Sequence, residues 1–556
     1  MVRDLARKYA LLNAVQHDGR ANAKAVLGRL LAEDASLRPR AKDLTKLVED
    51  VVAAVNALDR DAQRAEIEGT APELLKRRRE VKARELPDLS NVRGSVVMRF
   101  APFPSGPLHI GHARAIFLND YYVRRYGGKL ILAYDDTIGS EQKPLMPEAY
   151  DLIRDGIGWL GVSVHEEIYK SDRMPAFYQT GDLLLARGGA YVCECPPADL
   201  RANREKGVAC AHRGRAPEEN LDLWRRMLKG EFGEGEAIVR IRTDVRHPNP
   251  AFRDRVLFRI SEREHPRVGR KYRVWPLLEF SWAVDDHLLG VTHVLRGKDL
   301  VMEDEMERAI WDRLDVQRRP EFIHYGFLFF KDMDLSKSQL ARDIREGRLA
   351  GVDDPRTWTL QSLRRRGISP EALRTFILSF GISLTDVEVS ADNLYAENRK
   401  VIDASANRYF FVPEPVKITI EGLPAIDQVQ APVHPDFPER GTRALAVSPI
   451  VYVPHVDYDA FTRQEVRLKD FCNVVLDVRS EFTGRELKDV PKIQWVAEPH
   501  GVATRVVMPD GGVLEGLSES ALRTAKEGDV VQFERFGFVR VDTIDPQGIT
   551  CRFAHR

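Results

Sequence analysis

The residues His109-Ile110-Gly111-His112 follow an apolar segment, Val96–Phe100, and a turn rich in proline and glycine, 101–107. This order predicts a strand, a tight turn and a helix that begins at the two histidines. A helix N-terminus attracts phosphate through its unpaired N–H groups and its dipole, and imidazoles placed there can donate to phosphoryl oxygens as charge develops. The segment therefore predicts a phosphate site where the first strand of an α/β fold enters its helix.

A second segment far downstream, Leu335-Ser336-Lys337-Ser338, fits the same site. A lysine arriving from a distant loop can complete an electrostatic clamp on a phosphate. An H-x-G-H match alone is weak evidence in a chain of 556 residues. The two segments together predict a split site for the α-phosphate of ATP.

Strands and helices alternate after the histidines. A helix over about 112–126 ends at Gly127-Gly128, which suit a C-cap. A second apolar strand, Leu130–Tyr134, then ends at Asp135-Asp136-Thr137, and another helix is expected over about 147–160. Open parallel sheets bind ligands at the carboxyl ends of their strands, so we expect these carboxylates at a binding edge. Further apolar strands are predicted at Thr292–Leu295 and Phe322–Phe330.

The pattern of the chain changes several times along its length. Residues 1–90 show helical spacing, most clearly over Asp43–Leu58, whereas the chain from Val412 onward shows short β segments of the kind found in β-barrels. A chain of this length holds several domains. We expect a helical appended domain, 1–90; the first half of an α/β domain, 91–186; a cysteine-bearing insertion, 187–272; the second half of the α/β domain, 273–330; the lysine loop and a helical region, 331–411; and two β-barrels, 412–556.

Composition limits the location and the partners of the chain. Its formal net charge is zero, so no global basic field indicates a nucleic-acid partner, and the basic runs Lys76–Arg79 and Arg364–Arg366 are by default solvated helix faces. No apolar stretch approaches the roughly 18 to 20 residues of a membrane span, and the first residues lack a signal-peptide core. We expect a cytoplasmic protein without membrane contact.

Three of the five cysteines lie between Cys193 and Cys210, which favours a metal cluster in a reducing compartment over a disulfide framework. Cys193-x-Cys195 and Cys210-x-His212 supply four ligands of the kind that tetrahedral zinc prefers. We expect a structural zinc ion there, with four unligated residues in an insertion as the alternative. Cys472 and Cys551 are isolated and are expected in the core or at the surface.

Segments along nearly the whole chain resemble one enzyme family. They are Tyr9–Val15, Arg99–Pro102 with Pro104–Gly106, the two-histidine run, Asp135–Thr137, Ser171–Arg173, Val284–His287, Gly290–Lys298, the Ser-Lys-Ser loop, Asp353–Arg356, Leu363–Ile368 and Ala406–Phe410. On these residues the chain resembles the class I aminoacyl-tRNA synthetases of the glutamyl/glutaminyl subclass, specifically the archaeal-type glutamyl-tRNA synthetases.

The resemblance implies a multidomain α/β fold. It comprises a Rossmann-like catalytic domain with a helical N-terminal appendage, an inserted acceptor-stem domain with a zinc knuckle, a helical stem-contact region and C-terminal anticodon-binding β-barrels. It implies formation of glutamyl-adenylate from L-glutamate and ATP with Mg²⁺, with tRNA present, and transfer to the terminal adenosine of tRNA(Glu). Whether tRNA(Gln) is also charged stays open, and the family is usually monomeric.

The resemblance also implies roles for individual residues. Charge on the transferring phosphorus would be stabilised by His109, His112 and Lys337 as catalytic residues, with packed or capping histidines and a surface lysine as the alternative. The ATP-binding set comprises Pro104, Ser105, Gly106, His109, Gly111, His112, Leu335, Ser336, Lys337 and Ser338. The amino-acid-binding set comprises Arg99, Ala101, Asp135, Leu278 and Arg296.

Each group in the amino-acid set has a chemical reason. The guanidinium groups of Arg99 and Arg296 can grip the side-chain carboxylate of glutamate, and Asp135 can hold the α-ammonium group. Structural ion pairs are the alternative for both arginines. With a tRNA partner implied, the cluster Arg364, Arg365 and Arg366 is interpreted as a phosphate-binding surface.

The chain departs from the family pattern at several places. Leu278 replaces a tyrosine that shapes the side-chain pocket, the run Ala133–Gly139 replaces Arg-Phe-Asp-Asp-Thr-Asp-Pro, Phe103 replaces a polar residue, and Asp334 replaces a lysine that often opens the mobile loop. Loss of the tyrosine hydroxyl costs about 1 to 3 kcal/mol if its partner stays unpaired. Two other functions therefore stay open: a glutaminyl-tRNA synthetase, and a tRNA-binding paralogue that no longer charges.

Overall fold

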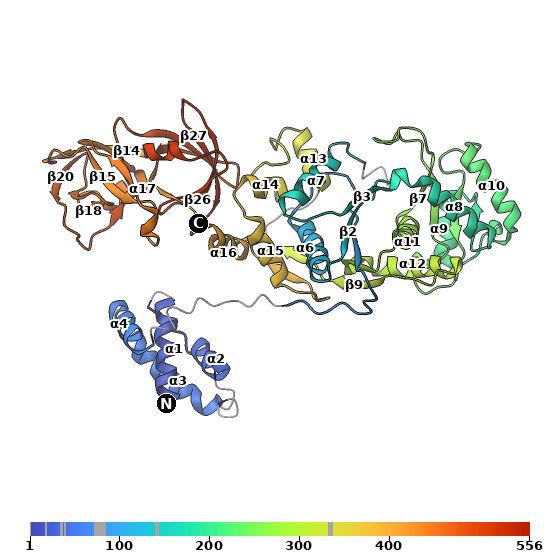
Figure 1. Cartoon of the computed structure of the whole chain (residues 1–556), viewed down its shortest axis with the longest axis horizontal. Coiled ribbons are helices and arrows are strands. Elements are labelled where there is room, and N and C mark those ends of the chain that lie inside the picture. Colours follow the sequence, from blue (N-terminus) through green and yellow to red (C-terminus); the bar gives the residue numbers. More distant parts are fainter. Residues whose placement is uncertain are drawn as a thin grey trace. The chain divides into compact units, whose positions relative to one another are not determined.

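The structure is a computed structural model that describes residues 2–16, 19–33, 37, 41–71, 85–138, 144–331 and 337–556. The chain divides into two compact units, Met1–Arg84 and Glu85–Arg556. Figure 1 colours the elements along the sequence and labels them. No helix in the described ranges is both long enough and apolar enough to cross a membrane.

The first unit is helical throughout its described part. Its helices are α1 (Val2–Gln16), α2 (Ala23–Glu33), α3 (Ala41–Asn56) and α4 (Arg60–Thr70). One face of α3 packs inward, and its Val48, Val51 and Val55 are buried with residues of α1 and α2. The buried Gln63 ties the unit together, because its Nε2 donates to the carbonyl oxygens of Val55, at 2.9 Å, and Gly19, at 3.0 Å.

The second unit begins with a parallel sheet in the order β1-β2-β3. These strands are β1 (Val97–Phe100), β2 (Lys129–Tyr134) and β3 (Glu166–Tyr169), and the connecting helices are α6 (Ile110–Arg125) and α7 (Ala149–Trp159). Gly127 adopts φ +58° after α6, and a Cβ on Gly128 would lie 2.4 Å from the carbonyl oxygen of Val96. The two glycines therefore end the helix, as predicted from the sequence, and Gly128 also allows the chain to enter β2 close to β1.

A second parallel pair, β8 (His293–Gly297) and β9 (Glu321–Tyr325), lies beside β1. The backbone N–H of Thr292 donates to the carbonyl oxygen of Val97 at 2.9 Å, so β8 begins beside β1. The strand predicted over 322–330 is wrong in one respect, because it divides at Gly326 into β9 and β10 (Leu328–Phe330). A Cβ on Gly326 would lie 2.4 Å from the carbonyl oxygen of Thr385, and β10 pairs instead with β11 (Val387–Val389).

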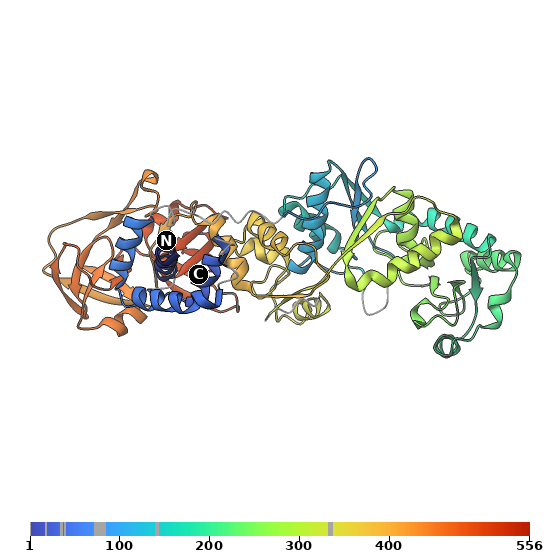
Figure 2. The same ribbon diagram turned by 90° about the horizontal axis from the view of Figure 1, so that it is seen from below.

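Between β3 and β8 the chain forms an antiparallel sheet in the order β4-β5-β6-β7. Its strands are β4 (Ala190–Cys193), β5 (Ile238–Ile241), β6 (Val256–Ile260) and β7 (Val274–Pro276). The helices in this stretch of the chain are α8 (Met174–Ala186), α9 (Pro197–Lys206), α10 (Pro217–Lys229) and α11 (Leu278–Leu288), and α12 (Val301–Leu314) follows β8. Trp224, Phe258 and Trp275 form its core. Helices α11 and α12 pack on each other and border the parallel sheet, as both views show (Figure 2).

The chain continues into α13 (Lys337–Arg345), α14 (Leu360–Arg365), α15 (Pro370–Ser379) and α16 (Ala391–Ile402). Two seven-stranded sheets follow. One contains β14 (Pro415–Glu421), β17 (Ile450–Pro454), β18 (Glu465–Leu468), β19 (Cys472–Val475), β20 (Arg479–Gly484), β21 (Lys492–Ile493) and β22 (Val496–Ala497). The other contains β12 (Arg408–Tyr409), β13 (Phe411–Pro413), β23 (Val502–Val507), β24 (Val513–Ser518), β25 (Val530–Phe533), β26 (Gly537–Ile544) and β27 (Ile549–His555).

Each of these curled sheets encloses its own apolar core. A hairpin of β15 (Gln428–Pro432) and β16 (Thr442–Ala446) and the short helix α17 (His455–Phe461) accompany them. Cys472 is buried in one core and Cys551 in the other, which accounts for the two isolated cysteines as core residues. The predicted α/β fold with a β-rich C-terminal part is confirmed.

Candidate functional site

The two histidines lie at the start of α6. His109 is the N-cap residue, and its Nδ1 accepts from the backbone N–H of Gly111 at 3.1 Å. The backbone N–H of His109 in turn donates to Nδ1 of His112 at 3.2 Å, and the two ring centroids are 3.8 Å apart. Capping therefore uses the Nδ1 atoms of both rings and fixes the two imidazoles side by side at the positive end of the helix dipole.

A distant segment holds this turn in place. The backbone N–H of Ile110 donates to the carbonyl oxygen of Trp358 at 3.0 Å, and the backbone N–H of Leu360 donates to the carbonyl oxygen of Leu108 at 2.9 Å. The helical region after the lysine loop is thus attached directly to the histidine turn. Of the predicted loop residues, Leu335 and Ser336 lie outside the described residues; Lys337 and Ser338 begin α13, and their side chains are outside the description too.

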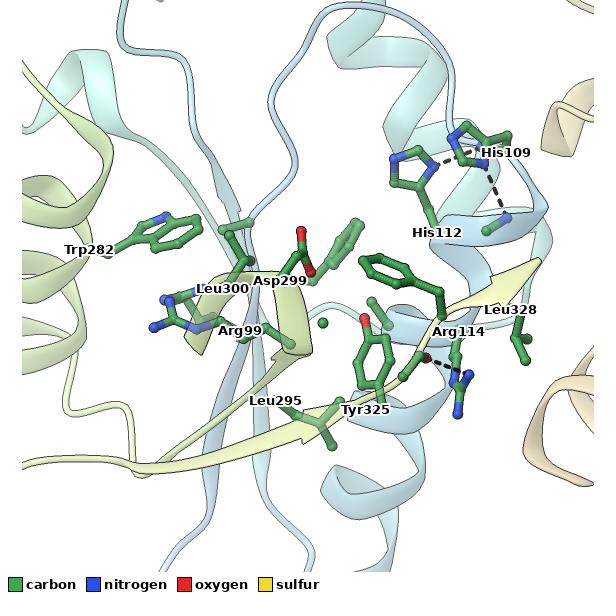
Figure 3. Close-up of a pocket in the computed structure, with 18 residues that line it drawn as sticks. Arg99, His109, His112, Arg114, Trp282, Leu295, Asp299, Leu300, Tyr325 and Leu328 are labelled. Carbon is green, nitrogen blue, oxygen red and sulfur yellow. Dashed lines mark hydrogen bonds between the residues drawn. The ribbon is translucent and has the colours of Figure 1, made fainter. Parts of the chain in front are cut away.

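A cavity of about 470 Å³ lies between the histidines and the ends of β1 and β8. Figure 3 shows the two histidines at one end of it and Trp282 with Arg99 at the other. Of the predicted site residues it brings together Arg99, Ala101, His109, Gly111, His112 and Arg296. Lining residues that the sequence analysis did not identify include Arg114, Trp282, Asp299, Tyr325 and Phe327. Pro104, Ser105, Gly106, Asp135 and Leu278 are not part of this lining.

Arg99 is 5% exposed and forms a bidentate pair with Asp286 of α11. Its Nε and Nη2 donate to the two carboxylate oxygens at 2.5 and 2.8 Å. Burial opposes the charge of this guanidinium, but the carboxylate of Asp286 raises the pKa of Arg99. Within the described part of the chain, no hydrogen bond from Nη1 is found, so this nitrogen is the one placed to bind a ligand.

Arg296, also 5% exposed, is engaged more completely. Its Nε and Nη2 donate to Asp304 at 3.1 and 2.5 Å, and its Nη1 donates to Glu307 at 2.8 Å. Burial raises the pKa of Glu307 to about 8, although Arg296 opposes that shift. All three guanidinium nitrogens of Arg296 therefore meet carboxylates of α12, which agrees with the structural ion pair considered as the alternative.

Asp135 lies at the carboxyl end of β2 and is 3% exposed. Its carboxylate is 2.9 Å from Nζ of Lys170, a lysine that is itself buried and that donates to Oγ of Ser281 at 2.6 Å. An α-ammonium group would therefore share Asp135 with Lys170.

Leu278 begins α11 and is only half-buried. Trp282, one turn further along the same helix, is 5% exposed and lines the cavity. Residues four apart lie on one face of a helix, and this spacing is the signal by which Trp282 could have been found from the sequence.

The cysteine cluster is assembled by β4 and the turn after α9. The ligand atoms of Cys193, Cys195, Cys210 and His212 all lie within 4.8 Å of one another. The Sγ atoms of Cys193 and Cys210 are 3.8 Å apart, and Sγ of Cys195 is 3.4 Å from Nδ1 of His212. A tetrahedral zinc ion with Zn–S bonds of about 2.3 Å separates two sulfurs by roughly 3.8 Å, so this set fits zinc.

The three arginines at the C-terminal end of α14 have different surroundings. Arg364 is 43% exposed and pairs with Asp155 at 2.8 Å, whereas Arg365 pairs with Asp353 at 2.9 Å and Asp542 at 2.8 Å. Arg366 is 1% exposed and its guanidinium lies 5.2 Å from the ring centre of Trp358. The prediction that all three contact tRNA is wrong for Arg366, because a buried side chain cannot reach a phosphate.

Three family descriptions match consecutive parts of the chain. "tRNA synthetases class I (E and Q), catalytic domain" matches residues 95–404. "tRNA synthetases class I (E and Q), anti-codon binding domain" matches residues 406–490 and again, as a second such domain, residues 492–542.

Curated relatives match over the full length. The glutamate–tRNA ligase of Methanocaldococcus jannaschii is 44% identical and covers 98% of this chain and 99% of its own. The corresponding ligases of Methanothermobacter thermautotrophicus and Thermococcus kodakarensis are 44% and 43% identical, each covering 100% of both chains.

Proposed function

Because the chain belongs to the class I tRNA synthetases (E and Q), we propose that it is a glutamate–tRNA ligase. It activates L-glutamate with ATP and transfers the glutamyl group to the 3′-terminal adenosine of tRNA(Glu). The observation that carries this proposal is the single cavity that joins the capped histidine pair to the open nitrogen of Arg99. A phosphate site and a carboxylate site in one cavity suit the condensation of an amino acid with ATP.

The first step needs positioning and charge stabilisation. The α-carboxylate of glutamate is ionised at neutral pH, so it attacks the α-phosphorus of ATP without a general base and displaces pyrophosphate. His109 and His112 stabilise the charge that develops on the phosphoryl oxygens, together with Lys337 from the start of α13. Bound Mg²⁺ would neutralise charge on the departing phosphates.

In the second step a ribose hydroxyl of the terminal adenosine attacks the acyl carbon of glutamyl-adenylate. The bond from that carbon to the phosphate oxygen breaks, and AMP leaves with the electron pair. The hydroxyl proton passes to the departing phosphate or to water. Both steps thus use the same cavity.

The amino-acid site follows from the ion pairs. Arg99 binds the side-chain carboxylate of glutamate through Nη1, while its pair with Asp286 holds the guanidinium still. Arg296 acts as support for this site, because its nitrogens are already engaged by Asp304 and Glu307. Asp135 binds the α-ammonium group in competition with Lys170.

We also propose that the cluster of Cys193, Cys195, Cys210 and His212 holds a structural zinc ion. Four protein ligands leave no coordination position for a substrate. Zinc would therefore hold the end of β4 and the turn after α9 together. Nη1 of Arg240 lies 4.0 Å from Sγ of Cys193 and 3.9 Å from Sγ of Cys210. This buried cation offsets the negative charge that three thiolates bring to the site.

The remaining parts of the chain would bind tRNA. The insertion over 187–272 would bind the acceptor stem, Arg364 and Arg365 would contact phosphates, and the two curled sheets over 412–556 would read the anticodon. We propose a cytoplasmic monomer that charges tRNA(Glu), and the test below decides whether tRNA(Gln) is also an acceptor.

The test is aminoacylation of purified tRNA(Glu) and tRNA(Gln) with labelled glutamate and labelled glutamine in parallel. Glutamate on tRNA(Glu) is expected, and glutamate on both tRNAs would make the enzyme non-discriminating. Glutamine on tRNA(Gln) would show that the amino-acid pocket beside Arg99 selects the amide. Binding of tRNA without charging would show a paralogue that has lost the reaction.

A further inference from the structure

Trp282 lies at the meeting point of the buried charges around the cavity. Its ring centre is 4.8 Å from the guanidinium carbon of Arg99, 5.0 Å from that of Arg296 and 5.3 Å from Nζ of Lys170. Figure 3 shows the indole beside Arg99, at the end of the cavity away from the histidines. Three cations thus face one aromatic ring in a site from which water is largely excluded.

Each of these cations is also held by a carboxylate. Arg99 pairs with Asp286, Arg296 with Asp304 and Lys170 with Asp135. A carboxylate fixes one edge of a guanidinium, and an aromatic face constrains the plane in which that guanidinium lies. The orientation of Nη1 of Arg99 therefore depends on both Asp286 and Trp282.

We propose that Trp282 is a positioning residue of the amino-acid pocket, whose indole face sets the planes of Arg99 and Arg296 so that Nη1 of Arg99 meets the side-chain carboxylate of the substrate. This inference rests on the proposed function, because it assumes that Arg99 binds that carboxylate.

The polar group of Trp282 supports a role of the ring face. Its Nε1 is buried and has no hydrogen-bond partner among the described residues, whereas Nε1 of the neighbouring Trp311 donates to the carbonyl oxygen of Ala283 at 2.8 Å. A buried indole N–H without a partner contributes nothing favourable. The ring is thus engaged through its face, and phenylalanine should replace it more successfully than an aliphatic side chain of similar size.

The experiment compares Trp282→Phe with Trp282→Met in steady-state charging of tRNA(Glu). Loss of the aromatic face in Trp282→Met should raise KM for glutamate about tenfold, as expected for loss of desolvated cation–π contacts. The values of KM for ATP and for tRNA should change less than about twofold, because the proposed function assigns neither ligand to Arg99. Trp282→Phe should recover most of the affinity for glutamate.

Trp224→Met is the matched control. Trp224 is also fully buried, and its Nε1 also has no partner in the described part of the chain, but its ring packs on Phe258 and Tyr178 rather than on cations. The melting temperature of Trp224→Met should fall as that of Trp282→Met does, but its KM for glutamate should equal that of the wild type. Trp282→Leu takes the place of Trp282→Met if that variant does not fold.

Equal KM values for glutamate in Trp282→Phe and the aliphatic variant would overturn the inference and leave the proposed function standing. An equal rise in KM for glutamate and for ATP would also overturn it, because it would show general loosening of the site. If the wild-type chain charges no amino acid, the proposed function fails and this inference fails with it.

Discussion

Arg99 and Arg296 occur in matching sequence contexts at the ends of two strands, yet their side chains differ in what they can do. All three guanidinium nitrogens of Arg296 donate hydrogen bonds to carboxylates, whereas only two of those of Arg99 do. The sequence identified both arginines by resemblance, but the division of work between them depends on Asp286, Asp304 and Glu307, which come from the helices packed beside the sheet. A guanidinium with one edge held and one nitrogen open is the better receptor for a carboxylate.

Arg99→Lys is therefore expected to lower kcat/KM for glutamate by about a hundredfold. This corresponds to roughly 2.7 kcal/mol of binding free energy, which is typical for the loss of one partner of a buried charge pair. A lysine ammonium cannot hold both oxygens of Asp286 and also reach the substrate. Charging kinetics at saturating ATP and tRNA measure this. Arg173→Lys is the control, because Arg173 pairs with the adjacent Asp285 at 2.5 Å and lies outside the cavity lining. Equal losses in the two variants would contradict the role of Arg99.

Glu307 makes stability depend on pH. Burial raises the pKa of its carboxyl from 4.5 to about 8, while Arg296 and Arg99 oppose the shift and Asp286 adds to it. Between these two values the folded chain binds a proton that the unfolded chain does not, so this group's stabilisation falls as pH rises from about 5 to 8, by at most about 1.4 kcal/mol per pH unit. Glu307→Gln should flatten that part of the curve of melting temperature against pH. Parallel curves for wild type and variant would contradict it.

At the scale of elements, features set by local sequence signals could be predicted, whereas features set by contacts between distant residues could not. The strand, turn and helix around His109 followed from a proline- and glycine-rich turn and from capping, which act within a few residues. The break of the predicted strand at Gly326 depends on the carbonyl oxygen of Thr385, and the anchoring of Ile110 depends on Trp358. Neither contact leaves a local pattern in the sequence. Trp282 lies one helical turn after Leu278, the residue that the resemblance places in the pocket, and only the packing of α11 shows which of the two lines the cavity.

The turn that carries Cys210 and His212 gives a prediction at the same scale. The purified wild-type chain should contain about one equivalent of zinc, and Cys210→Ser should retain far less, because a hydroxyl is a poor zinc ligand. Acid release followed by a colorimetric zinc assay measures this. Cys472→Ala removes a buried cysteine from a different core and should keep its zinc. Zinc content that is equal in the two variants would contradict the site.

At the scale of the whole molecule, one unit, 85–556, combines a parallel sheet with its inserted domain, a helical region and two curled sheets. It follows a separate unit, 1–84, whose described elements are helices. Family matches cover residues 95–542 almost continuously, and relatives align over the entire length. The order of these parts could be predicted because each has its own periodicity and motif. The choice between amino acids could not, because it depends on how a few side chains pack around one cavity.

The most direct test of the proposed activity is to incubate the enzyme with ATP, tRNA(Glu) and equal concentrations of glutamate and glutamine, and to measure the mass of the terminal adenosine after nuclease digestion. Glutamyl-adenosine is expected, with no signal when ATP is left out. Glutaminyl-adenosine, or unmodified adenosine despite bound tRNA, would contradict it.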